Sequence, residues 1–244
     1  MKKKNHSDKF TPHLLGKKIK QSQKKRHPTL TKSRIISPRN KGGRLIVFEG
    51  IDGAGTESLS KAFLDYFKKQ RKPVERIHYP DYTQPIGKVI HQYLHRKYDF
   101  PVETQFIFYF ADFVKDVETI NGWLREGKIV LADRYFTSAL AYQGLRGLPQ
   151  KEALNLAKIF KLPKPGLIIY LKISPDTSIK RKFREKKSLD RNEADRKFLG
   201  RLAKFYERLA KKKVFGKWVI VNGEGSIKEV FEEIKKIINK QFRL

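Results

Sequence analysis

A glycine-rich segment between a strand pattern and a helix pattern constrains the fold of this chain most. Residues 50–55 read GIDGAG, a G-x-x-x-x-G frame, and they follow the apolar run LIVF of residues 45–48. A helix pattern follows over residues 57–69. Glycines at such a junction let backbone N–H groups turn toward phosphate oxygens, at a helix N-terminus whose dipole favours anions. The arrangement predicts a phosphate-binding loop; a glycine turn without a ligand is the alternative.

The other strand and helix patterns alternate, which is typical of an α/β fold with a mostly parallel sheet. We expect further strands at residues 74–79, 129–133, 167–173 and 218–221. We expect further helices at residues 86–94, at residues 102–125, and from the N-cap Ser226 to about Lys240. Ligands of such sheets bind at the carboxyl ends of the strands.

Charge divides the chain into two regions. Residues 1–43 carry 11 Lys and 3 Arg against one acid, Asp8, a net charge of +13, without sustained periodicity. We expect this basic tail to be disordered unless a partner orders it. Residues 44–244 carry 41 basic and 24 acidic residues, a net charge of +17, and we expect them to form one domain.

The net charge of +30 predicts a polyanionic partner, with structured RNA such as the ribosome ahead of an anionic membrane. A lysine-rich proteome is the alternative, but heat-adapted chains raise both signs of charge together. The candidate nucleic-acid contacts are basic residues of the tail: Lys2, Lys3, Lys4, Lys17, Lys18, Lys20, Lys24, Lys25 and Arg26.

Several classes are excluded by composition. The chain has no cysteine, which excludes disulfides, zinc–cysteine sites and thiolate nucleophiles. No apolar run is long enough for a membrane span, and the basic N-terminus lacks the apolar segment of a secretory signal. We expect a cytoplasmic protein, with organellar targeting as the alternative. His91 and His95 have no third ligand nearby in the sequence, so we expect no metal site there.

Several further segments follow the glycine frame in a recognisable order. FEGIDGAG precedes ADRYFTSALAYQG at residues 132–144, then LPKP with a strand, then SLDRNE at residues 188–193. Over about residues 44–244 this order resembles thymidylate kinase, and D-R-Y-x-x-S-x-x-A-Y-Q-G is the most specific string. The resemblance implies a three-layer P-loop NTPase fold with a five-stranded, mostly parallel sheet flanked by helices. It also implies a homodimer that transfers the ATP γ-phosphoryl group to dTMP with Mg²⁺.

The resemblance assigns roles to individual residues. Asp52 would contact the deoxyribose 3′-hydroxyl or organise the metal, Asp133 would lie toward Mg²⁺, and Arg134 would contact phosphate oxygens. The phosphate loop would comprise Gly50, Gly53, Gly55, Thr56, Glu57 and Ser58. The dTMP pocket would comprise Tyr79, Tyr82, Tyr109 (stacked on thymine), Phe113, Tyr142 and Gln143. The lid, at about residues 180–193, would contain Arg181, Arg184, Asp190, Arg191 and Glu193, with the first two closing on ATP.

Plain structural interpretations of these residues stay open. Tyr109, Phe110 and Phe113 follow a helix period that is typical of core residues. Residues 190–193 could be a helix start with a capping carboxylate. The lid lysines could form a solvated face, and residues 133–134 could be an ion pair at a strand end.

The chain departs from the family pattern in its catalytic parts. Thr56 stands where a lysine would bridge the β- and γ-phosphates, and Glu57 stands where a hydroxyl would bind Mg²⁺. Ser58 is turned roughly 100° away on the helix. Tyr82 and Phe113 replace arginines that grip the dTMP phosphate and read the thymine edge.

Loss of the loop lysine costs several kcal/mol of transition-state stabilisation, or roughly 100-fold and more in rate. We therefore expect a thymidylate-kinase-like protein with weakened or lost catalysis that acts as a basic, ribosome-associated RNA-binding factor. An active dTMP kinase with ATP and Mg²⁺ is the alternative.

Overall fold

The computed structural model describes residues 42–185, 190–193 and 195–242. The chain divides into two units, Met1–Pro38 and Arg39–Leu244, and every described residue belongs to the second unit. The nine basic residues of the tail that are predicted to contact nucleic acid, between Lys2 and Arg26, lie outside the described residues.

Five parallel strands form one sheet in the part of the chain that the structure describes, in the order β2-β3-β1-β4-β5. The central strand β1 is buried over residues 45–50, as expected for a parallel strand that is covered on both faces. The predicted α/β class with a five-stranded parallel sheet is confirmed. The strands are β1 (Arg44–Gly50), β2 (Val74–His78), β3 (Ile129–Asp133), β4 (Leu167–Lys172) and β5 (Trp218–Asn222).

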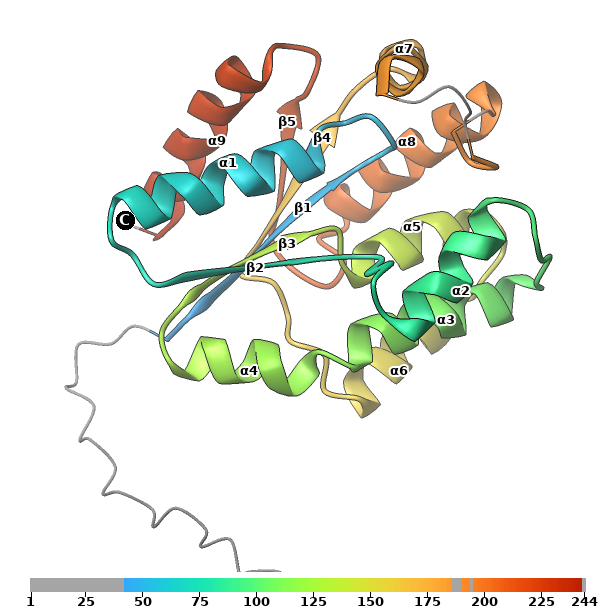
Figure 1. The fold of residues 1–244 in the computed structure, drawn as a ribbon, viewed down its shortest axis with the longest axis horizontal. Helices are drawn as coiled ribbons and strands as arrows, with labels where there is room; N and C mark the ends of the chain where they lie inside the picture. The colour runs from blue at the N-terminus through green and yellow to red at the C-terminus, as the bar shows by residue number, and fades with distance from the viewer. Residues whose placement is uncertain (1–41, 186–189, 194, 243–244) are drawn as a thin grey trace, which may run out of the picture. The chain divides into compact units, whose positions relative to one another are not determined.

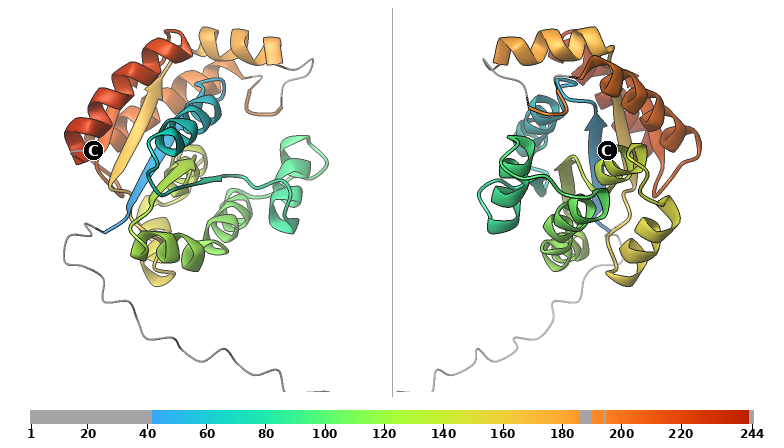
Figure 2. Two further views of the ribbon diagram at one scale, coloured as in Figure 1. Left: turned by 60° about the vertical axis from the view of Figure 1, so that its left-hand side comes forward. Right: turned by 90° about the vertical axis from the view of Figure 1, so that its right-hand side faces the viewer.

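Helices cover both faces of the sheet (Figure 1). On one face lie α1 (Thr56–Lys69) and α9 (Ile227–Phe242), and on the other lie α4 (Val117–Arg125), α5 (Phe136–Leu145) and α8 (Arg196–Lys211). Figure 2 shows α7 close to the end of β4. None of the described helices is long and apolar enough to cross a membrane. The remaining helices are α2 (Pro85–Leu94), α3 (Val102–Val114), α6 (Gln150–Ile159) and α7 (Pro175–Glu185).

The single helix predicted over residues 102–125 is wrong. The segment forms α3 and α4, and Lys115 and Asp116 lie between them. The Asp116 Oδ2 atom accepts hydrogen bonds from the Tyr79 hydroxyl at 3.1 Å and from Lys115 Nζ at 2.5 Å. These contacts hold Asp116 outside the helical conformation, and tertiary contacts of this kind override a continuous helix pattern.

The start of α9 agrees with the predicted N-cap. Ser226 Oγ accepts a hydrogen bond from the Glu229 N–H at 3.3 Å, and Glu229 Oε2 accepts one from the Ser226 N–H at 2.8 Å. This reciprocal pair is a capping box. It orients α9, which packs against α1 and β5.

Candidate functional site

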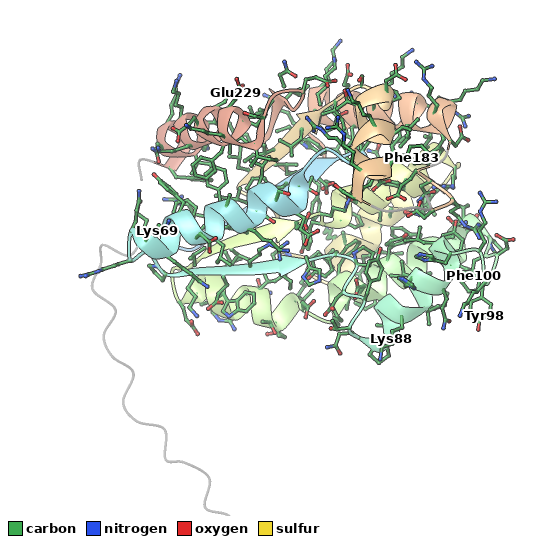
Figure 3. All side chains as sticks on the ribbon, turned by 45° about the horizontal axis from the view of Figure 1, so that its top comes forward. Lys69, Lys88, Tyr98, Phe100, Phe183 and Glu229 are labelled. Carbon is green, nitrogen blue, oxygen red and sulfur yellow. The ribbon has the colours of Figure 1, made fainter. Side chains whose placement is uncertain are left out.

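The candidate site lies at the carboxyl ends of β1, β2 and β3, which meet at one edge of the sheet. The register pairs Phe48 of β1 and His78 of β2 with Asp133 of β3. Next to these strand ends is a cavity of about 630 Å³. Figure 3 shows the same end of the molecule: Phe183 on α7 and Phe100 in the loop after α2 lie away from Lys69 at the far end of α1. The location agrees with the rule for ligand sites of parallel sheets.

The glycine loop adopts a conformation that other residues tolerate poorly. Gly53 and Gly55 have φ angles of 75° and 90°, in the left-handed region that glycine adopts without strain. A Cβ atom on Gly53 would also lie 2.8 Å from the Ser178 carbonyl oxygen. Ser178 Oγ donates a hydrogen bond to the Asp52 carbonyl at 2.5 Å. The loop is therefore packed directly against α7, and α1 begins immediately after it.

Asp52, Arg134 and Tyr142 form one hydrogen-bonded group at the cavity wall. Arg134 donates to Asp52 Oδ1 at 2.7 Å and to the Gly50 carbonyl at 2.8 Å, and the Tyr142 hydroxyl donates to Asp52 Oδ2 at 2.9 Å. The Arg134 and Asp52 side chains are only 17% and 19% exposed. Burial raises the pKa of the Tyr142 hydroxyl well above its usual value, so Tyr142 stays protonated and remains a donor. Asp52 of the glycine loop is thus brought together with Arg134 and Tyr142 of the D-R-Y string.

Asp133 contacts a cation that the sequence prediction did not include. The guanidinium of Arg76, on β2, donates to Asp133 Oδ2 at 3.0 Å and to Ser60 Oγ at 2.8 Å. The Thr56 hydroxyl also donates to the Asp133 carboxylate. Burial raises the pKa of Asp133, while the bond from Thr56 and the charges of Arg134 and Arg76 oppose the rise. An ion pair between residues 133 and 134, the alternative interpretation, does not form, because Arg134 pairs with Asp52.

Glu57 pairs with a lysine of its own helix. Its carboxylate lies 2.5 Å from Lys61 Nζ one turn further along α1, and its side chain is 65% exposed. The hydrogen bond from Lys61 lowers the pKa of Glu57, so Glu57 is ionised at neutral pH. The position of the family's metal-binding hydroxyl therefore holds a carboxylate that is paired locally. Ser58 also lines the cavity.

Aromatic side chains and one amide form another part of the cavity wall. Tyr79, Tyr82, Tyr109, Phe113 and Gln143 all line it. Phe113 is 1% exposed and packs edge-to-face on Tyr79 with ring centroids 4.9 Å apart, so it is both a core residue and part of the wall. Gln143 is 2% exposed, and its Oε1 atom has no hydrogen-bond partner in the described structure.

The predicted lid residues separate into two groups. Asp190 and Glu193 line the cavity and bond each other's backbone: Asp190 Oδ1 accepts from the Glu193 N–H at 3.0 Å, and Glu193 Oε2 accepts from the Asp190 N–H at 2.9 Å. This is capping geometry, but α8 begins later, at Arg196. Lys182 lines the cavity instead of Arg181, Arg184 or Arg191.

Two of the lid arginines contact other parts of the fold. Arg181 donates to the backbone carbonyls of Gly53 at 3.3 Å and Gly223 at 3.0 Å, which joins the loops after β1 and β5. Arg191 donates to Asp99 at 2.6 Å and stacks over the Tyr93 ring at 4.1 Å. Arg184 is exposed. The roles of these residues toward a nucleotide remain predictions.

The charge lining the cavity is opposite in sign to that of the chain as a whole. Each lining carboxylate accepts a hydrogen bond from within the protein. Two permanently charged basic side chains line the cavity, Arg134 and Lys182. Six carboxylates line it: Asp52, Glu57, Asp133, Glu185, Asp190 and Glu193.

Sequence reasoning missed Arg76, Lys182 and Glu49. Glu49 is fully buried and accepts hydrogen bonds from Thr137 and Ser138 at 2.5 and 2.6 Å. An acid inside an otherwise apolar buried strand was a signal for Glu49, because such a carboxylate needs buried donors. Nothing in the sequence distinguishes Arg76 from a solvated arginine.

The parallel sheet, the glycine loop between β1 and α1, and the acid at the end of the adjacent strand β3 define a P-loop protein with a nucleotide kinase fold. A sequence model of the thymidylate kinase family matches residues 48–234. The chain belongs to the thymidylate kinase family, and the predicted membership is confirmed.

Individual relatives agree with this assignment. The chain is 28% identical over 204 residues to thymidylate kinase of Dictyostelium discoideum, covering 83% of this chain and 88% of the relative. It is 32% identical over 206 residues to a probable thymidylate kinase of Staphylothermus marinus, covering 80% and 94%. Its fold is similar to the solved structure of thymidylate kinase from Candida albicans, with a TM-score of 0.65, 22% identity, and coverage of 82% of this chain and 93% of the other.

The family resemblance implies a Mg²⁺ ion near Asp133 and residue 57. The side chains present there are poorly suited to bind one. Glu57 replaces the hydroxyl ligand and pairs with Lys61, and Asp133 is paired with Arg76. Among the residues that the structure describes, no group of three histidine, aspartate or glutamate side chains could hold a metal ion. We therefore assign no step of a reaction to a metal at Asp133.

Proposed function

We propose that this protein binds a thymidine nucleotide in the cavity and transfers phosphoryl groups far more slowly than a relative with a complete loop. The observation that carries the proposal is the intact Asp52–Arg134–Tyr142 group beside a loop that holds Thr56 and Glu57. The first is suited to orienting a sugar and a phosphate. The loop lacks the lysine ammonium group that would stabilise the negative charge that develops on the leaving phosphate.

The base end of the cavity supports a pyrimidine. The buried Gln143 Oε1 has no partner among the described residues, and a buried acceptor of this kind is stabilised by a ligand donor such as the thymine N3–H. The half-buried Tyr109 ring lies in the wall and offers a stacking face. Phe113 offers no donor to the thymine carbonyl edge, so discrimination between bases rests on shape and on Gln143.

The phosphate end supports binding more than transfer. Backbone N–H groups at the start of α1 can donate hydrogen bonds to an anion, and Arg134 provides a fixed positive charge. Six carboxylates line the same cavity, and like charges in a partly dry site repel strongly. Negative charge builds up on the leaving phosphate in the transition state, where Thr56 offers only a hydroxyl, so catalysis is expected to be at least about 100-fold below that of a lysine-containing loop.

A coupled kinase assay with ATP and dTMP tests this proposal, together with calorimetric titration of dTMP. We expect dTMP binding that Arg134→Ala weakens, a low rate of dTDP formation, and a gain of roughly 100-fold or more when Thr56→Lys is combined with Glu57→Thr. A wild-type rate equal to that of the restored variant would establish the active dTMP kinase and refute weakened catalysis. Absence of any nucleotide binding would refute the proposed ligand.

RNA binding is a second candidate function, and the surface of α8 favours it. The outward positions Lys197, Arg201, Lys204, Arg208 and Lys211 are all exposed and recur every three or four residues. At 1.5 Å per residue this basic stripe is roughly 21 Å long. None of its members forms an ion pair with another described residue. A line of cations on one helix face suits the phosphates of a nucleic-acid backbone.

The RNA candidate is tested by the affinity for ribosomes and structured RNA across a salt series. We expect the triple change Lys197→Gln, Arg201→Gln and Lys204→Gln to weaken binding and to lower the salt slope by roughly one per lost phosphate contact. The matched control removes three exposed lysines of α9, namely Lys228, Lys236 and Lys240. No association at physiological salt, with and without residues 1–43, rules RNA out.

A homodimer, implied by the family resemblance, also belongs to the proposal. Ile107 on α3 is 53% exposed and Ile159 at the end of α6 is 68% exposed. Phe160, 46% exposed, contacts Phe110 of α3 with ring centroids 5.4 Å apart, so these apolar side chains share one region. Light scattering during size-exclusion chromatography should give twice the mass of the chain, and Ile107→Glu should give the monomer.

A further inference from the structure

Arg76 is held in place at both ends of its guanidinium. Its Nε atom donates to Ser60 Oγ at 2.8 Å, and its NH2 group donates to Asp133 Oδ2 at 3.0 Å. The first contact fixes it to α1 and the second to the end of β3. The side chains of Arg76 and Asp133 are 13% and 11% exposed, so mobile ions screen this pair much less than a surface pair.

Thr56 completes the surroundings of Asp133. The hydroxyl of Thr56 donates to the Asp133 carboxylate, and the Thr56 residue is 7% exposed. A threonine that occupies the position of the loop lysine therefore binds the acid rather than pointing at a phosphate. With Arg76, it gives Asp133 one charged and one neutral donor from within the protein.

A metal ion at this place would meet a charge of its own sign. A cation that coordinated Asp133 would lie within a few ångströms of the Arg76 guanidinium, in a site with little water, where like charges repel strongly. The hydroxyl ligand that the family resemblance implies is also replaced, by Glu57, whose carboxylate lies 2.5 Å from Lys61 Nζ. Mg²⁺ gives up its waters reluctantly and needs near-octahedral geometry, so it gains little from this donor set.

We propose that the Arg76 guanidinium takes the place of the divalent cation beside Asp133, so that the cavity binds its nucleotide without magnesium. This inference rests on the proposed nucleotide binding. It assigns Arg76 a positioning role: it holds Asp133 and, through Ser60, the first turns of α1. The ligand is accordingly a free nucleoside phosphate rather than its metal complex.

Calorimetric titration of ATP into the full chain, in EDTA and in MgCl₂, tests the inference. We expect the wild-type dissociation constant to change by less than about twofold between the two conditions. In Arg76→Leu, Mg²⁺ should strengthen ATP binding by about tenfold or more, which corresponds to about 1.4 kcal/mol. In Arg76→Leu combined with Asp133→Asn, this dependence on Mg²⁺ should disappear. Arg125→Leu, the same change at an exposed arginine of α4, should behave as wild type.

Electron paramagnetic resonance of Mn²⁺ alone gives a readout that needs no nucleotide. Arg76→Leu should bind Mn²⁺ at least about tenfold more tightly than wild type and than the double variant. A wild-type affinity for ATP that falls tenfold or more in EDTA overturns the inference while leaving nucleotide binding intact. Equal Mn²⁺ binding by wild type and Arg76→Leu also overturns it. If no nucleotide binds in either condition, both the proposed function and metal-free nucleotide binding are refuted. The Mn²⁺ comparison still decides whether Arg76 excludes the cation.

Discussion

Removing the buried carboxylate of Glu49 is expected to destabilise the protein by an amount that depends on what replaces it. Glu49 is 0% exposed and accepts from the Tyr135 N–H, the Thr137 and Ser138 hydroxyls and the Tyr206 hydroxyl, at 3.2, 2.5, 2.6 and 3.0 Å. The first three bonds attach the segment after Asp133, which carries Arg134, to β1, and the bond from Tyr206 attaches α8. Glu49→Ala would leave these donors without their acceptor and open a cavity.

The magnitude follows from the chemistry of the donors. A buried donor without an acceptor costs about 1–3 kcal/mol, and hydroxyls can turn toward other partners, so we expect Glu49→Ala to cost about 3–5 kcal/mol. Glu49→Gln keeps one carbonyl acceptor, and its amide can donate to hydroxyl oxygens. We expect it to cost about 1–2 kcal/mol. Free energies of unfolding from urea titrations measure both values.

The pH dependence gives a second measurement. Burial raises the pKa of Glu49 above its ordinary value of 4.5, against the lowering effect of its hydrogen bonds. A raised folded-state pKa gives stability that is fully present below the unfolded pKa and is lost as pH rises through the folded pKa. As pH rises above about 4.5, the unfolding free energy of wild type should therefore fall relative to that of Glu49→Gln. A shift in the opposite direction, or equal costs for Gln and Ala, would refute the reasoning.

Three further changes test other contacts. Gly53→Ala places a side chain at φ 75° and 2.8 Å from the Ser178 carbonyl, so we expect a loss of about 2 kcal/mol in urea unfolding; an unchanged midpoint would contradict the loop geometry. Ser226→Ala removes the capping box of α9 and should cost about 1 kcal/mol, seen as a lower melting temperature. Gln143→Leu should weaken dTMP binding about threefold to tenfold in calorimetry, with little effect on stability, because its buried oxygen has no partner in the described structure; an unchanged affinity would exclude Gln143 from base recognition.

The sequence predicted the parts of the fold that depend on local pattern. The glycine frame adopts positive φ angles at Gly53 and Gly55, and the predicted N-cap Ser226 bonds a residue close in sequence. The break between α3 and α4 was missed because its cause is the contact of Asp116 with Tyr79, 37 residues away along the chain. A helix pattern contains no information about such a partner.

The candidate site shows the same division. The motifs placed Asp52, Arg134 and Tyr142 at one site, because Asp52 lies in the glycine loop after β1 and the other two belong to the D-R-Y string that begins at the end of β3. They did not predict that Arg191 would turn toward Asp99 or that Arg76 would reach Asp133. Long cationic side chains choose among several acceptors, and only the packed structure fixes the choice.

The contrast between the charge of the chain and that of its cavity has a kinetic consequence. A chain with a formal net charge of +30 attracts anions over about a Debye length, roughly 10 Å at ordinary ionic strength, and accelerates encounter. The last step into a wall with six carboxylates opposes the same anion. A nucleotide should therefore collect rapidly at the surface and enter slowly, so that added salt slows its arrival while easing its final passage.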